Sequence, residues 1–455
     1  QQRFKAEQSS STANAPALRD LRSHIFDLKQ QYYLLLDTLR EDFPDYFQLR
    51  YGRPVVSLAT LRREVLPPGQ TLLEYFVGDD FLYLFILSDD GAELMRTRLD
   101  FPLREWVRDL RRQLLQFHPL RSADPMNLQR YEQRSFQLYY HLLGPAEHLL
   151  TDSVLVVVPD GVLGYLPFEC LLSRPMPVTD SWKAFPYLIR DYQISYRFAA
   201  SFLPEDLGEQ SGFQGELLAF APQFTGGEDE LKPLRYNVVE AQAIGRLLGG
   251  EVLLGGEATE ARFRESAGKY RILHLATHAQ ANDTIGAYSY LAFSTLKDSL
   301  ENELLYVRDL YNMRLPAEMV VLSACETGIG EWQRGEGIVS LGRGFLFAGA
   351  RSIVTTLWSV DDQPSAWIME RFYRHLKEGQ RKDAALREAK LEFLANNSDL
   401  RSHPLFWAGF IPVGEMEPIY GRGARASYGW WAAGISLGIL LLAVFWTKGP
   451  FQKIR

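Results

Sequence analysis

A histidine and a cysteine each follow a short apolar run in this chain. His278 ends the run 271–278 (RILHLATH), and Cys325 ends the run 319–325 (MVVLSAC), 47 residues further on. If the two runs form neighbouring parallel strands, their carboxyl ends meet at one edge of an open sheet, where α/β proteins build their sites. An imidazole beside a thiol can remove the thiol proton and so generate the nucleophilic thiolate. The spacing therefore predicts a Cys325/His278 catalytic pair.

The chemistry open to such a pair is acyl transfer at a carbonyl carbon. Cys325 would attack a peptide carbonyl, and His278 would activate the thiol or protonate the leaving amine. The backbone N–H groups of Cys325 and Ala279 could hold the oxyanion that forms in the transition state. These residues predict a cysteine peptidase whose substrate is a protein or a peptide.

Two other residues compete for roles in the same chemistry. His274 lies inside the first run, so we expect a hydrogen-bonded core residue or a support behind His278. His274 and His278 stand four residues apart, as zinc ligands can, but no third and fourth ligand follows at a suitable spacing, so neither metal nor cofactor is expected. Cys170 lies within LPFECLL and is expected to be a buried, unreactive thiol.

Specificity is less clearly encoded. Asp361 and Asp362 follow a predicted strand that ends at Trp358. A carboxylate there could bind an Arg or Lys side chain of the substrate through charge-assisted hydrogen bonds, or could cap the helix that follows. Trp358 could form the wall of a subsite or simply pack in the core. Glu326, next to the nucleophile, could shape the cleft or cap a helix.

The elements that would position these residues alternate between strands and helices. Such alternation with short loops predicts a mostly parallel sheet covered by helices on both faces. Besides the His278 and Cys325 runs, strands are expected at 71–77, 81–87, 153–159, 192–197, 217–221, 251–254, 352–358 and 406–413. Helices are expected at 103–117, 128–150, 237–248, 260–268, 305–313, 337–348, 363–376 and 382–396.

The two ends of the chain have their own patterns. Apolar residues recur at three- and four-residue steps over 18–49, which predicts an amphipathic helical segment, either the end of a helical array or a simple packing helix. Residues 428–446 carry no charge, have tryptophans at both ends and are long enough to span a bilayer. We interpret them as a C-terminal membrane anchor that keeps the folded body in the cytosol; a buried core helix is the alternative.

Composition excludes several classes of protein. The 455 residues are 46% hydrophobic and 23% charged, as expected for a globular chain with a large core. The net charge is −7, and no basic stripe is interleaved with aromatic residues, which argues against direct nucleic-acid binding. Two cysteines do not make a disulfide framework, which fits a reducing compartment.

Several motifs in the chain resemble those of CHAT domains, which are caspase-like peptidases related to separase and often fused to TPR repeats. The resemblance covers about residues 50–415 and includes the two runs that end in His278 and Cys325. The motifs are LHLATH (273–278), VLSACETG (321–328), GEGIVS (335–340), LWSVDD (357–362), VPDG (158–161), LPFE (166–169) and HPLFWAGF (403–410).

The resemblance implies a caspase-like three-layer α/β sandwich in which a degenerate half precedes the catalytic half. It also implies TPR repeats upstream of Gln1 that deliver or regulate a protein partner, and a basic P1 side chain bound by an acidic residue at the position of Asp362. One departure is Ala279, where many relatives carry Gly. The organisation expected is a helical segment (1–49), the degenerate half (50–215), the catalytic half (216–415), a linker (416–427), the anchor (428–446) and a tail (447–455).

Two other functions remain compatible with the sequence. The chain could keep the fold and recruit partners without cleaving them, as a degenerate scaffold. It could also use the same pair of residues for an acyl-transfer or hydrolytic reaction other than proteolysis.

Overall fold

The computed structural model forms two compact units, residues 1–60 and residues 61–455. In the first unit, α2 (Ala15–Asp42) is an amphipathic helix of 28 residues, followed by the single turn α4 (Leu58–Thr60). The structure describes residues 15–42, 57–122, 124–176, 181–200, 212–224, 231–282, 284–294, 303–324, 330–333, 337–360 and 362–421.

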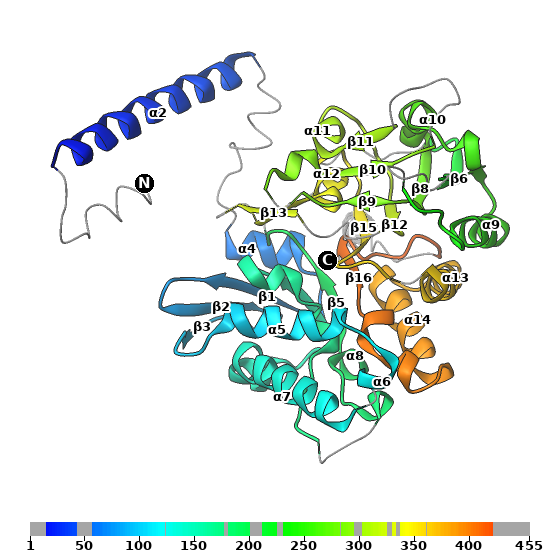
Figure 1. Cartoon of the computed structure of the whole chain (residues 1–455), viewed down its shortest axis with the longest axis horizontal. Helices are drawn as coiled ribbons and strands as arrows, with labels where there is room; N and C mark the ends of the chain where they lie inside the picture. Colours follow the sequence, from blue (N-terminus) through cyan, green and yellow to red (C-terminus); the bar gives the residue numbers. More distant parts are fainter. Residues whose placement is uncertain are drawn as a thin grey trace, which may run out of the picture. The chain divides into compact units, whose positions relative to one another are not determined.

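The described part of the second unit is built on an 11-stranded sheet, which Figure 1 shows at the centre of the fold. In spatial order the strands are β3 (Ala92–Arg98), β2 (Phe81–Leu87), β1 (Gln70–Val77), β4 (Val154–Val158), β5 (Gln193–Tyr196), β16 (Phe410–Gly414), β15 (Ser352–Thr356), β12 (Met319–Leu322), β8 (Tyr270–Leu275), β6 (Gly215–Ala221) and β7 (Glu251–Leu254).

Nine strands of the sheet form two parallel blocks that run in opposite directions, and the other two, β2 and β3, pair antiparallel at the edge beside β1. Strands β1, β4, β5 and β16 are parallel to one another, and so are β15, β12, β8, β6 and β7. The blocks meet where β16 pairs antiparallel with β15. The closing strand of the chain therefore joins both halves in one sheet. The predicted mostly parallel, caspase-like α/β fold is confirmed.

Helices cover both faces of this sheet, as the near-continuous apolar strands require. Beside the second block, α9 and α13 pack together on one face, and α11 and α12 pack together on the other (Figure 1). The helices are η1 (Leu61–Val65), α5 (Leu103–Leu115), α6 (Pro119–Ser122), α7 (Pro125–Leu142), α8 (Leu188–Asp191), α9 (Asn237–Leu248), α10 (Glu260–Ser266), α11 (Val307–Leu310), α12 (Leu341–Phe347), α13 (Asp362–Lys377) and α14 (Lys382–Asn396).

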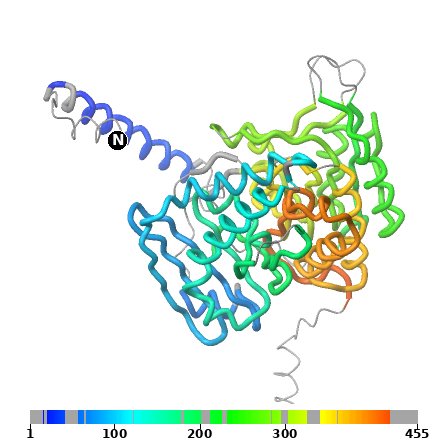
Figure 2. Tube along the Cα trace, turned by 60° about the horizontal axis from the view of Figure 1, so that its bottom comes forward, coloured from blue at the N-terminus to red at the C-terminus, as the bar shows by residue number. Residues whose placement is uncertain are grey.

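Helix α14 connects the two halves. It contacts β5 and α8 of the first half as well as β16, and Figure 2 shows it, in orange, beside both. Its Arg387 donates hydrogen bonds to the carbonyl oxygens of Ile189 and Arg190 at 2.8 and 2.6 Å. Its Lys390 reaches the buried carboxylate of Glu169. The first half is therefore fixed to the second by side chains of α14.

In two of the segments expected to be helical, the chain forms a short strand before the helix begins. Within 305–313 the chain first forms β11 (Leu304–Tyr306), which pairs with β10 (Tyr290–Ala292), and only then the single turn α11. Within 337–348 the segment β14 (Gly337–Ser340) pairs with β13 (Gly330–Gln333), and α12 begins after Ser340. Ser340 sets that boundary because its hydroxyl caps the helix by accepting a hydrogen bond from Arg343 N.

The prediction of a membrane anchor is contradicted by the structure. No helix in the described residues is long and apolar enough to cross a bilayer. The longest of them, α2, has the length but carries charged residues along its course, including Asp27 and Lys29. Residues 428–446, on which the expectation rested, lie outside the described part of the chain.

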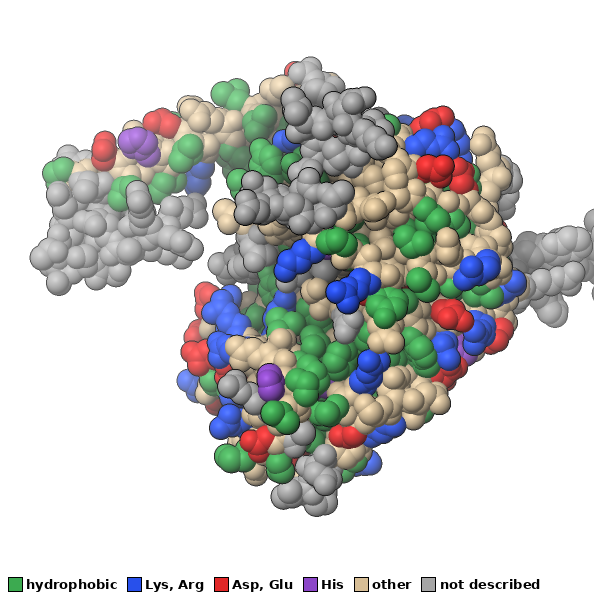
Figure 3. Space-filling model, turned by 45° about the vertical axis from the view of Figure 1, so that its right-hand side comes forward, with side chains coloured by type: hydrophobic (Ala, Val, Ile, Leu, Met, Phe, Trp, Pro, Cys, Tyr) green, Lys and Arg blue, Asp and Glu red, His purple; other side chains and the backbone are tan. Residues whose placement is uncertain are grey.

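Charged side chains of both signs are mixed on the face of the molecule shown in Figure 3. Lys and Arg alternate there with Asp, Glu and hydrophobic side chains and do not form a single stripe.

Candidate active site

Strands β8 and β12 are direct neighbours and run parallel. Their register pairs Val320 with Leu273 and Leu322 with Leu275, so both strands end at the same level of the sheet. Buried, mostly branched side chains make both strands part of the core. Counted along the sequence, His278 is the third residue after one strand and Cys325 the third after the other. Cys325 itself lies outside the described residues, so the pairing of the two side chains stays a prediction.

A backbone carbonyl fixes the orientation of the His278 imidazole. Nε2 of His278 lies 2.6 Å from the carbonyl oxygen of Lys232, and the ring packs against Phe224 with 4.8 Å between ring centroids. Since a carbonyl oxygen only accepts hydrogen bonds, Nε2 carries the proton and Nδ1 is the ring nitrogen that can accept one. A base oriented by a third group in this way is typical of nucleophilic catalysis by Cys or Ser.

A small three-stranded sheet holds the backbone on both sides of His278. Its strands are β11, β10 and β9 (Ala279–Gln280), and Ala292 N donates to the carbonyl oxygen of His278 at 2.9 Å. Ala279 pairs with Leu291 in this sheet. Because a strand residue has negative φ, the backbone at this position accommodates alanine and does not require glycine. The oxyanion role of the Ala279 N–H stays a prediction.

His274 lies in the core, beneath α9 and α13. Its side chain is fully buried, with Nε2 3.0 Å from Glu240 Oε1 and Nδ1 3.1 Å from the Tyr373 hydroxyl. Burial and, second, the charge of Glu240 raise the pKa of Tyr373 well above its usual range, so its hydroxyl stays protonated. His274 therefore belongs to a buried polar cluster behind the strand that leads to His278.

A cavity of about 400 Å³ opens beside the ends of β8, β12 and β15. Asp362 lines it from the start of α13, and its Oδ2 also accepts a hydrogen bond from Arg235 N at 3.1 Å. The cavity is lined by Leu234, Asn237, Glu240, Ala276, Thr277, Ser323, Ala324, Thr356, Val360, Asp362, Ser365 and Phe410.

Other predicted site residues do not lie in this cavity or are not described. Trp358 is 1% exposed and donates its indole N–H to the carbonyl oxygen of Leu405 at 2.9 Å, so it packs in the core and does not line the cavity. Asp361 and Glu326 lie outside the described residues, as Cys325 does. Glu240 and the Lys232 carbonyl were not predicted from the sequence, which gave no signal for either.

Metal binding has no support in the described residues, where no three His, Cys, Asp or Glu side chains are grouped to hold an ion. The two candidate histidines also have different surroundings. His278 is bound to a backbone carbonyl, and His274 is enclosed in the core.

Cys170 is a buried thiol without access to solvent. Its Sγ donates to the carbonyl oxygen of Pro167 at 3.2 Å, and burial, followed by the charge of Glu169, raises its pKa to about 12. The thiolate is therefore absent at neutral pH. We expect native protein at pH 8 to react with one equivalent of a thiol reagent and denatured protein with two. Two fast equivalents in the native protein would contradict the burial of Cys170.

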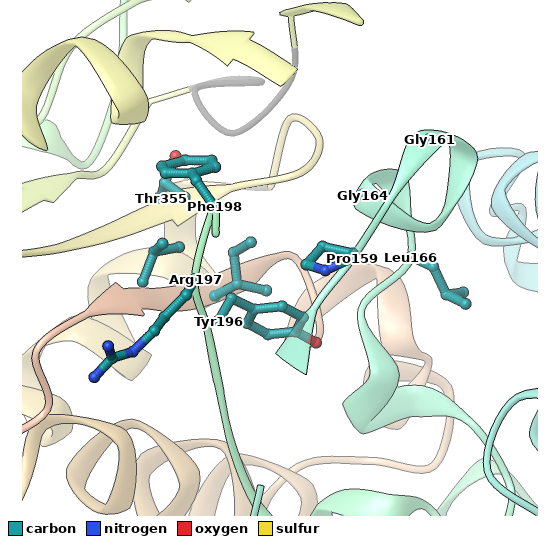
Figure 4. Close-up of a pocket in the computed structure, with 10 residues that line it drawn as sticks. Pro159, Gly161, Gly164, Leu166, Tyr196, Arg197, Phe198 and Thr355 are labelled. Atoms are coloured by element: carbon teal, nitrogen blue, oxygen red, sulfur yellow. The ribbon is translucent and has the colours of Figure 1, made fainter. Parts of the chain in front are cut away.

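A larger cavity of about 560 Å³ lies on the other face of β15 and is mostly apolar. Figure 4 shows Phe198 and Thr355 on one side of it, the Tyr196 ring facing Pro159, and the Arg197 side chain pointing away. Thr355 lines this cavity, whereas its neighbour Thr356 lines the cavity with Asp362. None of the described residues that line the larger cavity belongs to β8, to β12 or to the residues that follow them, so we do not assign the catalytic chemistry to it.

A family model and two curated relatives match parts of this chain. A family model described as CHAT domain matches residues 132–415. Tetratricopeptide repeat protein 28 of Mus musculus and that of Homo sapiens are each 29% identical over 206 residues, covering 38% of this chain and 8% of the relative. The chain thus spans only a small part of the length of the curated relatives it matches.

Among solved structures, separase in the Saccharomyces cerevisiae separase–securin complex is similar in fold. One structure of this complex superposes with a TM-score of 0.50 at 9% identity, covering 89% of this chain and 34% of separase. A second gives 0.50 at 8% identity over 79% of this chain and 30% of separase. At these identities the likeness is one of fold alone.

Proposed function

This chain belongs to the CHAT domain family, and on that premise we propose that it is a caspase-like cysteine endopeptidase that cleaves a protein partner through Cys325 and His278. The proposal rests mainly on one observation: the parallel strands β8 and β12 end at the same level of the sheet. His278 is the third residue after β8, and Cys325 is the third residue after β12. The oriented imidazole of His278 supports it.

The reaction we propose has two steps. Sγ of Cys325 bonds to the carbonyl carbon of the scissile peptide while His278 takes the thiol proton; the C–N bond then breaks, and His278 gives that proton to the leaving amine. Water next attacks the thioester, releases the acid product and restores the thiol. The backbone N–H groups of Cys325 and Ala279 would stabilise the oxyanion in both steps.

The Lys232 carbonyl would support both proton transfers. By accepting the Nε2–H it fixes the ring tautomer with Nδ1 as the base, and it stabilises the doubly protonated imidazolium that forms after the thiol proton is taken. The carbonyl belongs to the backbone, so this support does not depend on the side chain of Lys232. Lys232→Ala is therefore a suitable neutral control for variants of the pair.

The substrate side chain that precedes the cleaved bond is proposed to be basic. Asp362 lines the cavity beside the ends of β8 and β12, where the P1 side chain of a bound peptide would lie. With peptides that differ only at P1, we expect Arg or Lys to be preferred. We expect Asp362→Asn to lower kcat/KM for the basic peptides about tenfold, because a charge-assisted hydrogen bond is lost. An unchanged preference in that variant would remove Asp362 from substrate recognition.

Regulation is proposed to come from a protein partner or from TPR repeats. The similarity to tetratricopeptide repeat protein 28 supports an association with such repeats, and the separase relative was solved with securin bound. Measuring cleavage with and without an added TPR array tests this point.

A further inference from the structure

The cavity that holds Asp362 contains a second carboxylate, Glu240, and neither Lys nor Arg is among its described lining residues. We infer that Glu240 is a further specificity-determining residue. With Asp362 it makes this cavity a receptor for the positively charged P1 side chain, a guanidinium or an ammonium group. The inference rests on the proposed peptidase function. It adds to the contact of the P1 side chain with Asp362 a second, deeper contact with Glu240.

Burial distinguishes the two carboxylates. Glu240 is 4% exposed, whereas Asp362 is only partly buried at the first residue of α13. A long basic side chain that enters from solvent would therefore pass Asp362 before it reaches Glu240. Arg and Lys have the length and the charge for both contacts, and Arg can bind a carboxylate through two parallel hydrogen bonds.

The first turn of α9 fixes Glu240 in position. One turn earlier, Asn237 donates its amide to the carbonyl oxygens of Pro222 and Ala276 at 2.8 and 3.4 Å, which ties the start of α9 to the ends of β6 and β8. Residues three apart on a helix lie on the same side, so Glu240 faces the strand ends as Asn237 does. The carboxylate is thus held in the cavity wall by a rigid element.

Among the described residues, the side chain within ion-pair distance of the Glu240 carboxylate is that of His274. Glu240 Oε1 lies 3.0 Å from His274 Nε2, but the contact lacks the alignment of a hydrogen bond, and Oε1 accepts no other one there. Even a protonated His274 would balance only one of the two carboxylates. A buried negative charge is costly unless it is paired, so the cavity favours a ligand that brings a positive charge.

The test compares peptides with Arg, Lys or norleucine at P1 on the full chain, its Glu240→Gln variant and the control Glu257→Gln. Glu257 is an exposed carboxylate outside the cavity. We expect Glu240→Gln to lower kcat/KM for the Arg peptide about 10- to 100-fold and to leave the norleucine peptide nearly unchanged, because a buried charged hydrogen bond is lost. An equal loss for all three peptides, or an unchanged Arg-to-norleucine ratio, would overturn the inference.

Two further variants keep the test decisive. Glu240→Asp retains the charge and should retain part of the Arg preference. If Glu240→Gln does not fold, Glu240→Met with His274→Leu removes both buried polar groups together, which proteins tolerate better than one unpaired group. The same loss of the Arg-to-norleucine ratio is expected from it.

A binding measurement separates this inference from the proposed function. N-acetyl-arginine amide and N-acetyl-norleucine amide are titrated calorimetrically into the Cys325→Ala protein with and without Glu240→Gln. Binding of the arginine amide that depends on Glu240, in a chain whose wild type cleaves nothing, would keep the inference and reject the peptidase. Cleavage by the wild type without dependence on Glu240 would keep the peptidase and reject the inference.

Discussion

We expect peptide cleavage to fall at least about a thousandfold when Cys325 is replaced by alanine, and by a similar factor for His278→Ala, because nucleophile and base act as a unit. The double variant is expected to have a kcat/KM similar to that of either single variant. Once one member of the pair is gone, the other can no longer contribute to catalysis, so its removal costs little more. The measurement is kcat/KM on the best peptide of a P1-diverse fluorogenic library.

Matched controls separate catalysis from folding. Cys170→Ala removes the buried thiol, and His148→Ala removes an exposed imidazole of the first half. Both should keep activity within a few-fold of wild type, and neither Cys325→Ala nor His278→Ala should change the thermal midpoint by more than a few degrees. Full activity in His278→Ala would show that another group activates the thiol.

The largest effect on stability is expected at Lys390. Its side chain is 1% exposed, and its ammonium group donates to Glu169 Oε1 at 3.2 Å and to the carbonyl oxygen of Phe410 at 2.6 Å. Tyr196 donates its hydroxyl to Glu169 Oε2 at 2.5 Å. Lys390→Met leaves the Glu169 carboxylate buried without its cation, so the free energy of unfolding should fall by about 3–5 kcal/mol.

Replacing both partners should cost less than replacing one. In Lys390→Met with Glu169→Leu no charge remains to be desolvated, and we expect at least half of the lost stability to return. Lys377→Met, an exposed lysine on α13, serves as the control and should change the free energy of unfolding by less than about 1 kcal/mol. Denaturant titrations followed by circular dichroism give all four values. A double variant as unstable as Lys390→Met would contradict the explanation that the unpaired charge of Glu169 causes the loss of stability.

The periodic core elements of the fold could be predicted from the sequence. Strand 81–87 and helices 237–248 and 382–396 have the predicted bounds, because their apolar patterns are long and end at clear boundaries. Strand β3 was missed because its sequence, AELMRTR, is polar and mostly exposed at the sheet edge. The strands of two to four residues in β9–β11 and in the β13–β14 hairpin are too short to show a period.

The candidate site was predictable only where side chains follow strands. His278 follows the apolar run of β8, and Asp362 follows that of β15; β12 lies between these two strands in the sheet. The Lys232 carbonyl lies 46 residues away from His278 in sequence and has no side-chain signature. Glu240 looks like an ordinary polar residue of a helix until α9 packs over β8 and brings it to His274. Long-range packing determined these two contacts.

The most direct test of the proposed pair needs no substrate. The alkylation rate of Cys325 by iodoacetamide is measured from pH 5 to pH 10 in Cys170→Ala protein, with and without His278→Ala. A free thiol reacts with an apparent pKa of about 8.5. If His278 activates Cys325, the rate should rise at a lower pH than this, and His278→Ala should move the profile back toward that of a free thiol. Identical profiles in the two proteins would contradict the Cys325/His278 pair.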